Sequence, residues 1–100
     1  MITLHPGEKR DIIAGVGQLI GTGAISLANQ QVKILDPTGA VAIDWTGTGV
    51  TWDGTNAFLY YTFDSTVTAL RTAGEYTVHL RGTIGSELYE IAIAVRLLGS

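Results

Sequence analysis

The sequence predicts an all-β fold, a single sandwich or barrel built from short strands. Apolar and polar residues alternate along several runs, turn signals rich in Gly, Thr, Asn and Asp separate these runs, and helical periodicity is absent. A chain of 100 residues has the length of one domain. We therefore expect one domain over residues 1–100, in which residues 1–7 form an extended N-terminal arm.

The alternating runs mark the expected strands and the turns between them. These strands cover residues 9–14, 24–27, 30–35, 40–45, 50–52, 56–63, 75–81 and 87–97. Around Gly15 to Gly23 the glycines also fit bulges within one long strand, so both interpretations of residues 8–28 stay open. The expected turns are Asp36-Pro37-Thr38-Gly39, Thr46-Gly47-Thr48-Gly49, a type I′ turn at Asp53-Gly54, one helical turn within 64–70, and a hairpin loop over 82–86.

Alternation also predicts which side chains face the core. The expected inward residues are Val32, Ile34, Val41, Ile43, Trp45, Ala57, Leu59, Tyr61, Phe63, Tyr76, Val78, Leu80, Tyr89, Ile91, Ile93, Val95 and Leu97. Either Trp45 or Trp52 is expected to be the core indole, with the other at a rim.

The stretch Thr72-Ala73-Gly74-Glu75-Tyr76-Thr77-Val78 contains a structural motif. A tyrosine near the start of the penultimate strand of a Greek-key sandwich turns its hydroxyl back to the backbone just upstream. Tyr76 has this position, and Gly74 before it permits a close approach of the chain. This tyrosine corner favours a Greek-key immunoglobulin-like β-sandwich of about seven to eight strands. An ordinary half-buried strand tyrosine is the alternative.

Three segments resemble the immunoglobulin-like sandwich modules of tailed-bacteriophage virions, such as the N-terminal domain of baseplate upper proteins. They are Val32-Lys33-Ile34-Leu35-Asp36-Pro37-Thr38-Gly39, Asn56-Ala57-Phe58-Leu59-Tyr60-Tyr61-Thr62-Phe63 and Ala73-Gly74-Glu75-Tyr76-Thr77-Val78. The resemblance implies a structural role in a tail, baseplate or capsid, with no catalytic residues. It also implies a chain assembled into a virion in the host cytoplasm, whose partners are other virion proteins and copies of itself.

Charge and composition exclude several classes of function. The net charge of −3 gives no broad basic surface for nucleic acid, and the absence of cysteine excludes disulfides and Cys-based zinc sites. The N-terminus lacks the basic and apolar regions of a signal peptide, and no apolar run is long enough to span a membrane as a helix. We therefore expect a soluble chain made in the cytosol, with no nucleic-acid or membrane partner.

The sequence offers no convincing catalytic, metal or cofactor site. A Ser–His–Asp set could be drawn from Ser65, His79 and Asp64, but no pattern places them together, and His79 alternates with apolar residues as an outward histidine. The aspartates stand singly at turns and strand ends, whereas calcium needs several oxygens at one place. The glycine-rich stretches 21–24 and 46–49 open no helix and lack the lysine of a phosphate loop.

The outward positions of the strands favour assembly. Only 15% of the residues are charged, against about 25% in ordinary domains. Where a solvated strand would alternate to polar residues, this chain has Ala40 and Ala42 in one strand and Ala92 and Ala94 in the last. Plain tolerance of alanine in strands is the alternative interpretation.

Two further groups complete the interface prediction. Met1, Ile2 and Leu4 belong to the arm, which is expected to add to the sheet edge of a neighbouring copy. Phe58 and Tyr60 lie opposite the inward face of their strand, where exposed apolar rings indicate a protein contact. Their rings also suit stacking against sugars, so a carbohydrate-binding module for host-surface glycans is the second hypothesis.

Overall fold

The computed structural model describes residues 2–15, 27–54 and 58–99, and nearly all of its regular structure is β. The strands are β1 Ile2–Leu4, β2 Lys9–Gly15, β3 Ala28–Leu35, β4 Val41–Thr46, β5 Val50–Asp53, β6 Phe58–Asp64, β7 Gly74–Ile84 and β8 Glu87–Leu97, with a 3₁₀ helix, η1, over Thr68–Leu70. The predicted strands and the single helical turn are thus present where the described residues cover them, except that Leu27, the one described residue of 24–27, lies before β3 and outside any strand. The uncertain stretch 16–26 and the inward position of Ala57 lie outside those residues.

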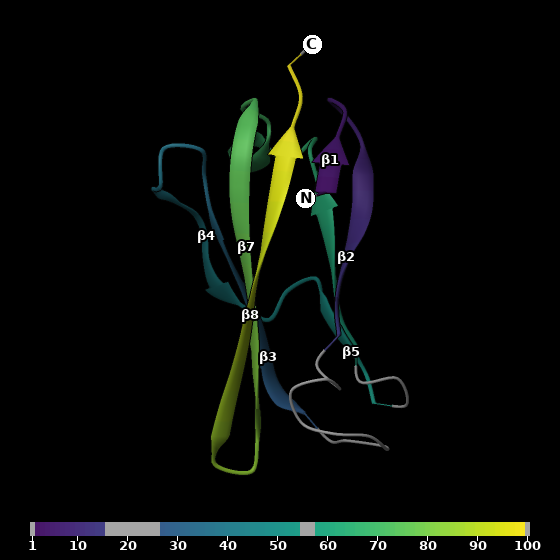
Figure 1. Cartoon of the computed structure of the whole chain (residues 1–100), viewed down its shortest axis with the longest axis vertical. Helices are drawn as coiled ribbons and strands as arrows, with labels where there is room; N and C mark the ends of the chain where they lie inside the picture. Colours follow the sequence, from purple (N-terminus) through teal and green to yellow (C-terminus); the bar gives the residue numbers. More distant parts are fainter. Residues whose placement is uncertain (1, 16–26, 55–57, 100) are drawn as a thin grey trace.

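The strands form two sheets that pack as a sandwich (Figure 1). One sheet has the order β1-β8-β7-β3-β4 and the other β2-β6-β5. The orders β8-β7-β3 and β2-β6-β5 match the G-F-C and B-E-D orders of immunoglobulin domains, with β4 added beside β3. The predicted all-β, Greek-key, immunoglobulin-like sandwich is confirmed.

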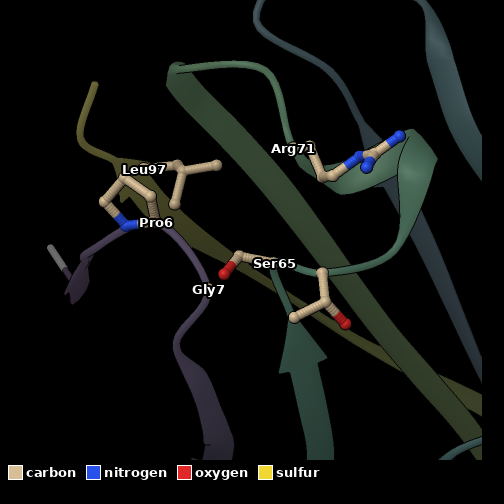
Figure 2. Close-up of a pocket in the computed structure, with 6 residues that line it drawn as sticks. Pro6, Gly7, Ser65, Arg71 and Leu97 are labelled. Atoms are coloured by element: carbon tan, nitrogen blue, oxygen red, sulfur yellow. The ribbon is translucent and has the colours of Figure 1, made fainter. Parts of the chain in front are cut away.

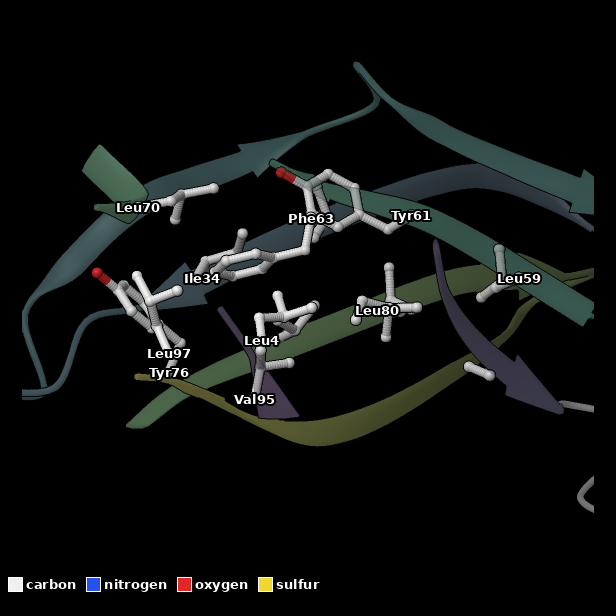
Figure 3. Packing of buried hydrophobic residues seen from close by; sticks show 14 of the residues in the cluster. Leu4, Ile34, Leu59, Tyr61, Phe63, Leu70, Tyr76, Leu80, Val95 and Leu97 are labelled. Atoms are coloured by element: carbon white, nitrogen blue, oxygen red, sulfur yellow. The ribbon is translucent and has the colours of Figure 1, made fainter. Parts of the chain in front are cut away.

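The core lies between the two sheets and is formed by alternate residues of the long strands. Leu59, Tyr61 and Phe63 enter it from β6, and Leu80 enters from β7 (Figure 3). Val78 of β7 is also fully buried. The predicted inward faces of β3, β6 and β7 are therefore confirmed for the described residues. In the half of β8 nearer to the β7–β8 hairpin, Tyr89, Ile91 and Ile93 are only partly buried, although they pack against the same cluster.

The tyrosine corner is present at the start of β7. Tyr76 is fully buried, its ring packs edge-on against Phe63 with centroids 5.4 Å apart, and its hydroxyl donates a 2.7 Å hydrogen bond to the carbonyl of Thr72. Gly74 has φ +139°, and a Cβ there would lie 2.6 Å from the Pro37 side chain. Both the backbone conformation and the space therefore require glycine at this position.

The face prediction for β4 is wrong for Val41 and Trp45, and it is confirmed for Ile43, which packs against the core. Val41 is 51% exposed, whereas Ala42 and Ile43 pack against the core, and Trp45 lies on the outer face beneath the Arg81 guanidinium. The physical reason is the irregular pairing of β3 with β4, whose register shifts twice and so breaks the two-residue alternation. Of the two tryptophans, Trp52 is the one that packs against the core.

The loops differ from the predictions in two places. The β7–β8 ladder continues to Ile84 and Glu87, so the hairpin turn is the two residues Gly85-Ser86 rather than 82–86. The pairing of Asp53 with Phe58 puts residues 54–57 between β5 and β6, which is longer than a two-residue type I′ turn. The turn at Asp36 is as predicted, because its carboxylate accepts hydrogen bonds from the backbone N–H groups of Thr38 and Ala40.

The N-terminal arm is a strand of the chain's own sheet, which corrects the prediction that it adds to a neighbour. Ile2, Thr3 and Leu4 pair in parallel with Val95–Leu97 of β8, and Leu98 N–H donates 2.9 Å to the Leu4 carbonyl. Leu4 is 0% exposed and Ile2 packs against the core. Burying Leu4 within the chain removes it from solvent at once, which accounts for this placement.

Candidate interaction surfaces

The outer face of the three-stranded sheet carries an apolar cluster, which we call the aromatic patch: Ile13, Phe58 and Tyr60. Ile13 is 52% exposed and pairs across the ladder with Tyr60, and Gly15 pairs with Phe58. The rings of Phe58 and Tyr60 meet edge to face, with centroids 6.2 Å apart and planes at 81°. Sequence alternation places both rings on this face, opposite Leu59 and Tyr61, and the structure agrees.

The neighbours of the aromatic patch are polar. Thr51 pairs with Tyr60 from β5, and Thr62 donates a 2.7 Å hydrogen bond to the Asp11 carboxylate on β2. The patch is therefore an apolar island with a polar rim at one side. Ile13 was not singled out from the sequence, although it occupies the outward position between Ile12 and Ala14, which are both buried.

The outer face of the five-stranded sheet is polar at β3 and β7. Arg81 lies with its Cζ 3.6 Å from the Trp45 ring centroid and donates from Nε and Nη2 to the side-chain oxygen of Gln31. Lys33 also approaches the indole, at 5.9 Å. Both distances lie within the range in which a cation is attracted to the face of an aromatic ring.

Next to this polar cluster, β8 presents its small residues. Ala92 is exposed and Ala94 is half-buried, both on the outer face as predicted. Ala92 pairs with His79, whose Nδ1 lies 3.5 Å from the carboxylate of Glu90. Leu88, at the start of the same strand, is 58% exposed.

The other predicted interface residues do not share one surface. Ala40 is exposed beside the Asp36 turn, whereas Ala42 faces the core and is wrong as an interface residue. Ile2 and Leu4 are used within the chain, as described above. Met1 lies outside the described residues.

A hollow of about 330 Å³ opens at the end of the sandwich where the β1–β2 loop meets the chain after β6 (Figure 2). Its lining residues are Pro6, Gly7, Ser65, Thr66, Arg71 and Leu97. The Ser65 hydroxyl donates 2.7 Å to the carbonyl of Glu8, so it ties this loop to β6. His79 lies on the outer face of the other sheet, where its side chain contacts the Glu90 carboxylate. Ser65, His79 and Asp64 therefore do not form a triad.

Three partly buried carboxylates accept hydrogen bonds from backbone N–H or hydroxyl groups at turns. The hydrogen bond from the Thr38 hydroxyl lowers the pKa of Asp36, and the one from Thr66 lowers the pKa of Asp64. The His5 backbone N–H does the same for the pKa of Glu8. Each carboxylate closes its own loop, and this is the local role that turn aspartates usually have.

Within residues 2–15, 27–54 and 58–99, no three His, Asp or Glu side chains lie close enough together to hold a metal ion. The same residues contain no helix with the length and apolarity to cross a bilayer.

Comparison with known proteins identifies the fold alone. No family model and no curated protein matches the sequence. The chain is similar to the X-ray structure of the endo-beta-1,4-mannanase from Thermotoga petrophila, with a TM-score of 0.61 and 14% sequence identity over 99% of this chain. It spans only 18% of the length of that mannanase chain.

Proposed function

We propose that this chain is a non-enzymatic structural module of a multi-copy protein particle, such as a tailed-phage tail, baseplate or capsid. It binds copies of itself and other virion proteins through its sheet faces and edges, after synthesis in the host cytoplasm. The observation that carries the proposal is the aromatic patch on the outer face of the three-stranded sheet.

The physical argument concerns the cost of leaving this patch in water. The exposed face of an antiparallel sheet normally alternates to polar residues, and Ile13, Phe58 and Tyr60 depart from that pattern. Burying one large apolar side chain contributes about 1.5–3 kcal/mol, so covering the patch favours association. The three residues are not among those that line the hollow at the end of the sandwich, and an exposed apolar patch of this kind usually marks a contact with another protein.

The test is incorporation into particles. A tagged chain expressed during particle production is expected to co-sediment with the particles, and Ile13→Lys is expected to reduce this because it places a charge in the contact. Val67→Lys is the matched control, since Val67 is also an exposed branched residue, 42% exposed, but lies outside the patch. A wild-type chain that joins no particle and stays monomeric would contradict the proposal.

A carbohydrate-binding module is the second candidate, because Phe58 and Tyr60 are partly exposed side by side. Sugars stack on ring faces, but the 81° angle between these rings gives no common flat platform. For this reason we favour the protein contact. A glycan array tests the alternative: retention that Phe58→Ala and Tyr60→Ala both abolish would establish it, and no retention by the wild-type chain would end it.

A further inference from the structure

Among the described residues, most of one edge of β8 has no partner strand. The strand pairs with β7 along its whole length, from Glu87 to Leu97, but with β1 only over Val95–Leu97. On that side, no strand within residues 2–15, 27–54 or 58–99 pairs with residues 87–94. The β7–β8 hairpin forms the lower end of the molecule in Figure 1.

The direction of the backbone groups follows from one hydrogen bond. Leu98 N–H donates to Leu4 of β1, so the even-numbered residues of β8 point their N–H and C=O groups toward the β1 side. The ladder with β7 has no register shift, and the alternation therefore continues down the strand. The residues whose backbone groups face the unpaired edge are Leu88, Glu90, Ala92 and Ala94.

The residues of β8 along this edge lack the sequence features that usually prevent strand addition. Between Leu88 and Val95 there is no proline, lysine or glycine, and the pairing with β7 has no bulge. The only charge is Glu90, whose carboxylate already lies 3.5 Å from His79. Such an edge is a template for another strand.

We infer that β8 pairs antiparallel with β8 of a second copy of this chain, so that the two five-stranded sheets become continuous. This inference rests on the proposed function, and it specifies one partner and one register. A two-fold axis passes through Ile91, which lies opposite Ile91 of the other copy.

The register follows from three constraints. The core-facing residues of both copies must stay on one side of the joined sheet, and this allows only registers that pair odd residues with odd residues. If the two-fold axis passed through Glu90, the two Glu90 carboxylates would lie opposite each other, which is unfavourable. If it passed through Ala92, the partner strand would run into β1. With the axis at Ile91, residues 88–94 of each copy pair, and this matches the part of β8 that β1 leaves unpaired.

The same register accounts for the alanines. Each Ala94 lies opposite Leu88 of the other copy, and each Ala92 lies opposite Glu90. A small residue thus meets a larger one at every outward position, so the cross-strand pairs pack without overlap. On the inner side Tyr89 meets Ile93, which covers two residues that are only partly buried in the single chain.

Cysteine cross-linking tests the register directly, because the chain has no cysteine of its own. Residue 91 is in a non-hydrogen-bonded pair with Cα atoms about 4.5 Å apart, a spacing that a disulfide bridges. Ile91→Cys is expected to give a covalent dimer on mild oxidation. Ile93→Cys, half-buried on the same face, is the matched control and is expected to stay uncross-linked. Equal cross-linking of both variants, or of neither, overturns the inference.

Charge substitutions at residue 92 give a second measurement that needs no disulfide. Ala92→Glu faces Glu90 of the other copy and is expected to raise the dimer Kd about two- to thirty-fold, whereas Ala92→Lys is expected to lower it. Ala40→Glu is the control, as an exposed alanine away from the edge. Sedimentation velocity over a concentration series gives each Kd, and identical values for Ala92→Glu and Ala92→Lys contradict the register.

The outcomes separate this inference from the proposed function. A cross-linked dimer that joins no particle supports the inference and rejects the proposed function. A chain that joins particles while Ile91→Cys stays uncross-linked keeps the proposed function and rejects the β8 pairing.

Discussion

At the scale of single residues, the buried Tyr76 donates a side-chain hydrogen bond to the Thr72 carbonyl. Tyr76→Phe keeps the ring against Phe63 but removes the bond to Thr72, so the free energy of unfolding is expected to fall by about 0.5–1.5 kcal/mol. Urea unfolding measures the change. Tyr60→Phe is the control on the surface, and an equal loss in both variants would mean that Tyr76 does not pin the corner.

The turn carboxylates set the response to acid. The pKa values of Glu8, Asp36 and Asp64 are lowered in the folded chain by the hydrogen bonds that these groups accept. A lowered folded-state pKa gives stability that is present above the unfolded pKa and is lost as pH falls through the folded value.

We therefore expect the free energy of unfolding to be level above about pH 5 and to decrease below about pH 4. Asp36→Asn removes one of the three groups, so its pH dependence should be shallower than that of the wild-type chain. Urea unfolding at a series of pH values checks this, and parallel curves for the two proteins would show that Asp36 makes no contribution.

At the scale of elements, β1 is the strand whose position differs most from the sequence prediction. Leu4→Ala is expected to lower the free energy of unfolding by about 2–5 kcal/mol, because the side chain is fully buried between the sheets. Thr3→Ala, exposed on the same strand, should change little. Thermal unfolding compares the two, and similar stability of both variants would mean that residues 2–4 do not belong to the sandwich.

The elements that alternation predicted well are those with regular ladders. β6 and β7 pair without register shifts over most of their length, so one side of each strand is buried and the period of two is visible in the sequence. In β4 the bulged pairing with β3 breaks this period, and the sequence of one strand does not reveal a shift relative to its neighbour. β1 has only three residues, too few for alternation to show a side.

The sequence predicted some of the exposed residues of the interaction surfaces and missed others. Phe58, Tyr60, Ala92 and Ala94 were recognisable because they lie in regular strands, whereas Ile13 was hidden beside a buried isoleucine. How much of the β8 edge stays unpaired among the described residues depends on how far β1 extends along it, which is a property of the tertiary pairing alone.

At the scale of the whole molecule, the low content of charged residues corresponds to apolar surface in two places. The aromatic patch lies on one sheet, and the apolar β8 edge lies on the other. Under the proposed function, these two places would let one chain contact several neighbours in a particle. A module with one surface would form only closed pairs.

The central claim is that this chain assembles through its own surface, and its mass in solution tests that claim most directly. Light scattering of the wild-type chain across a concentration series is expected to give a mass that rises from 10.6 kDa toward that of the dimer or a larger assembly. A mass that stays at 10.6 kDa at every concentration would contradict it.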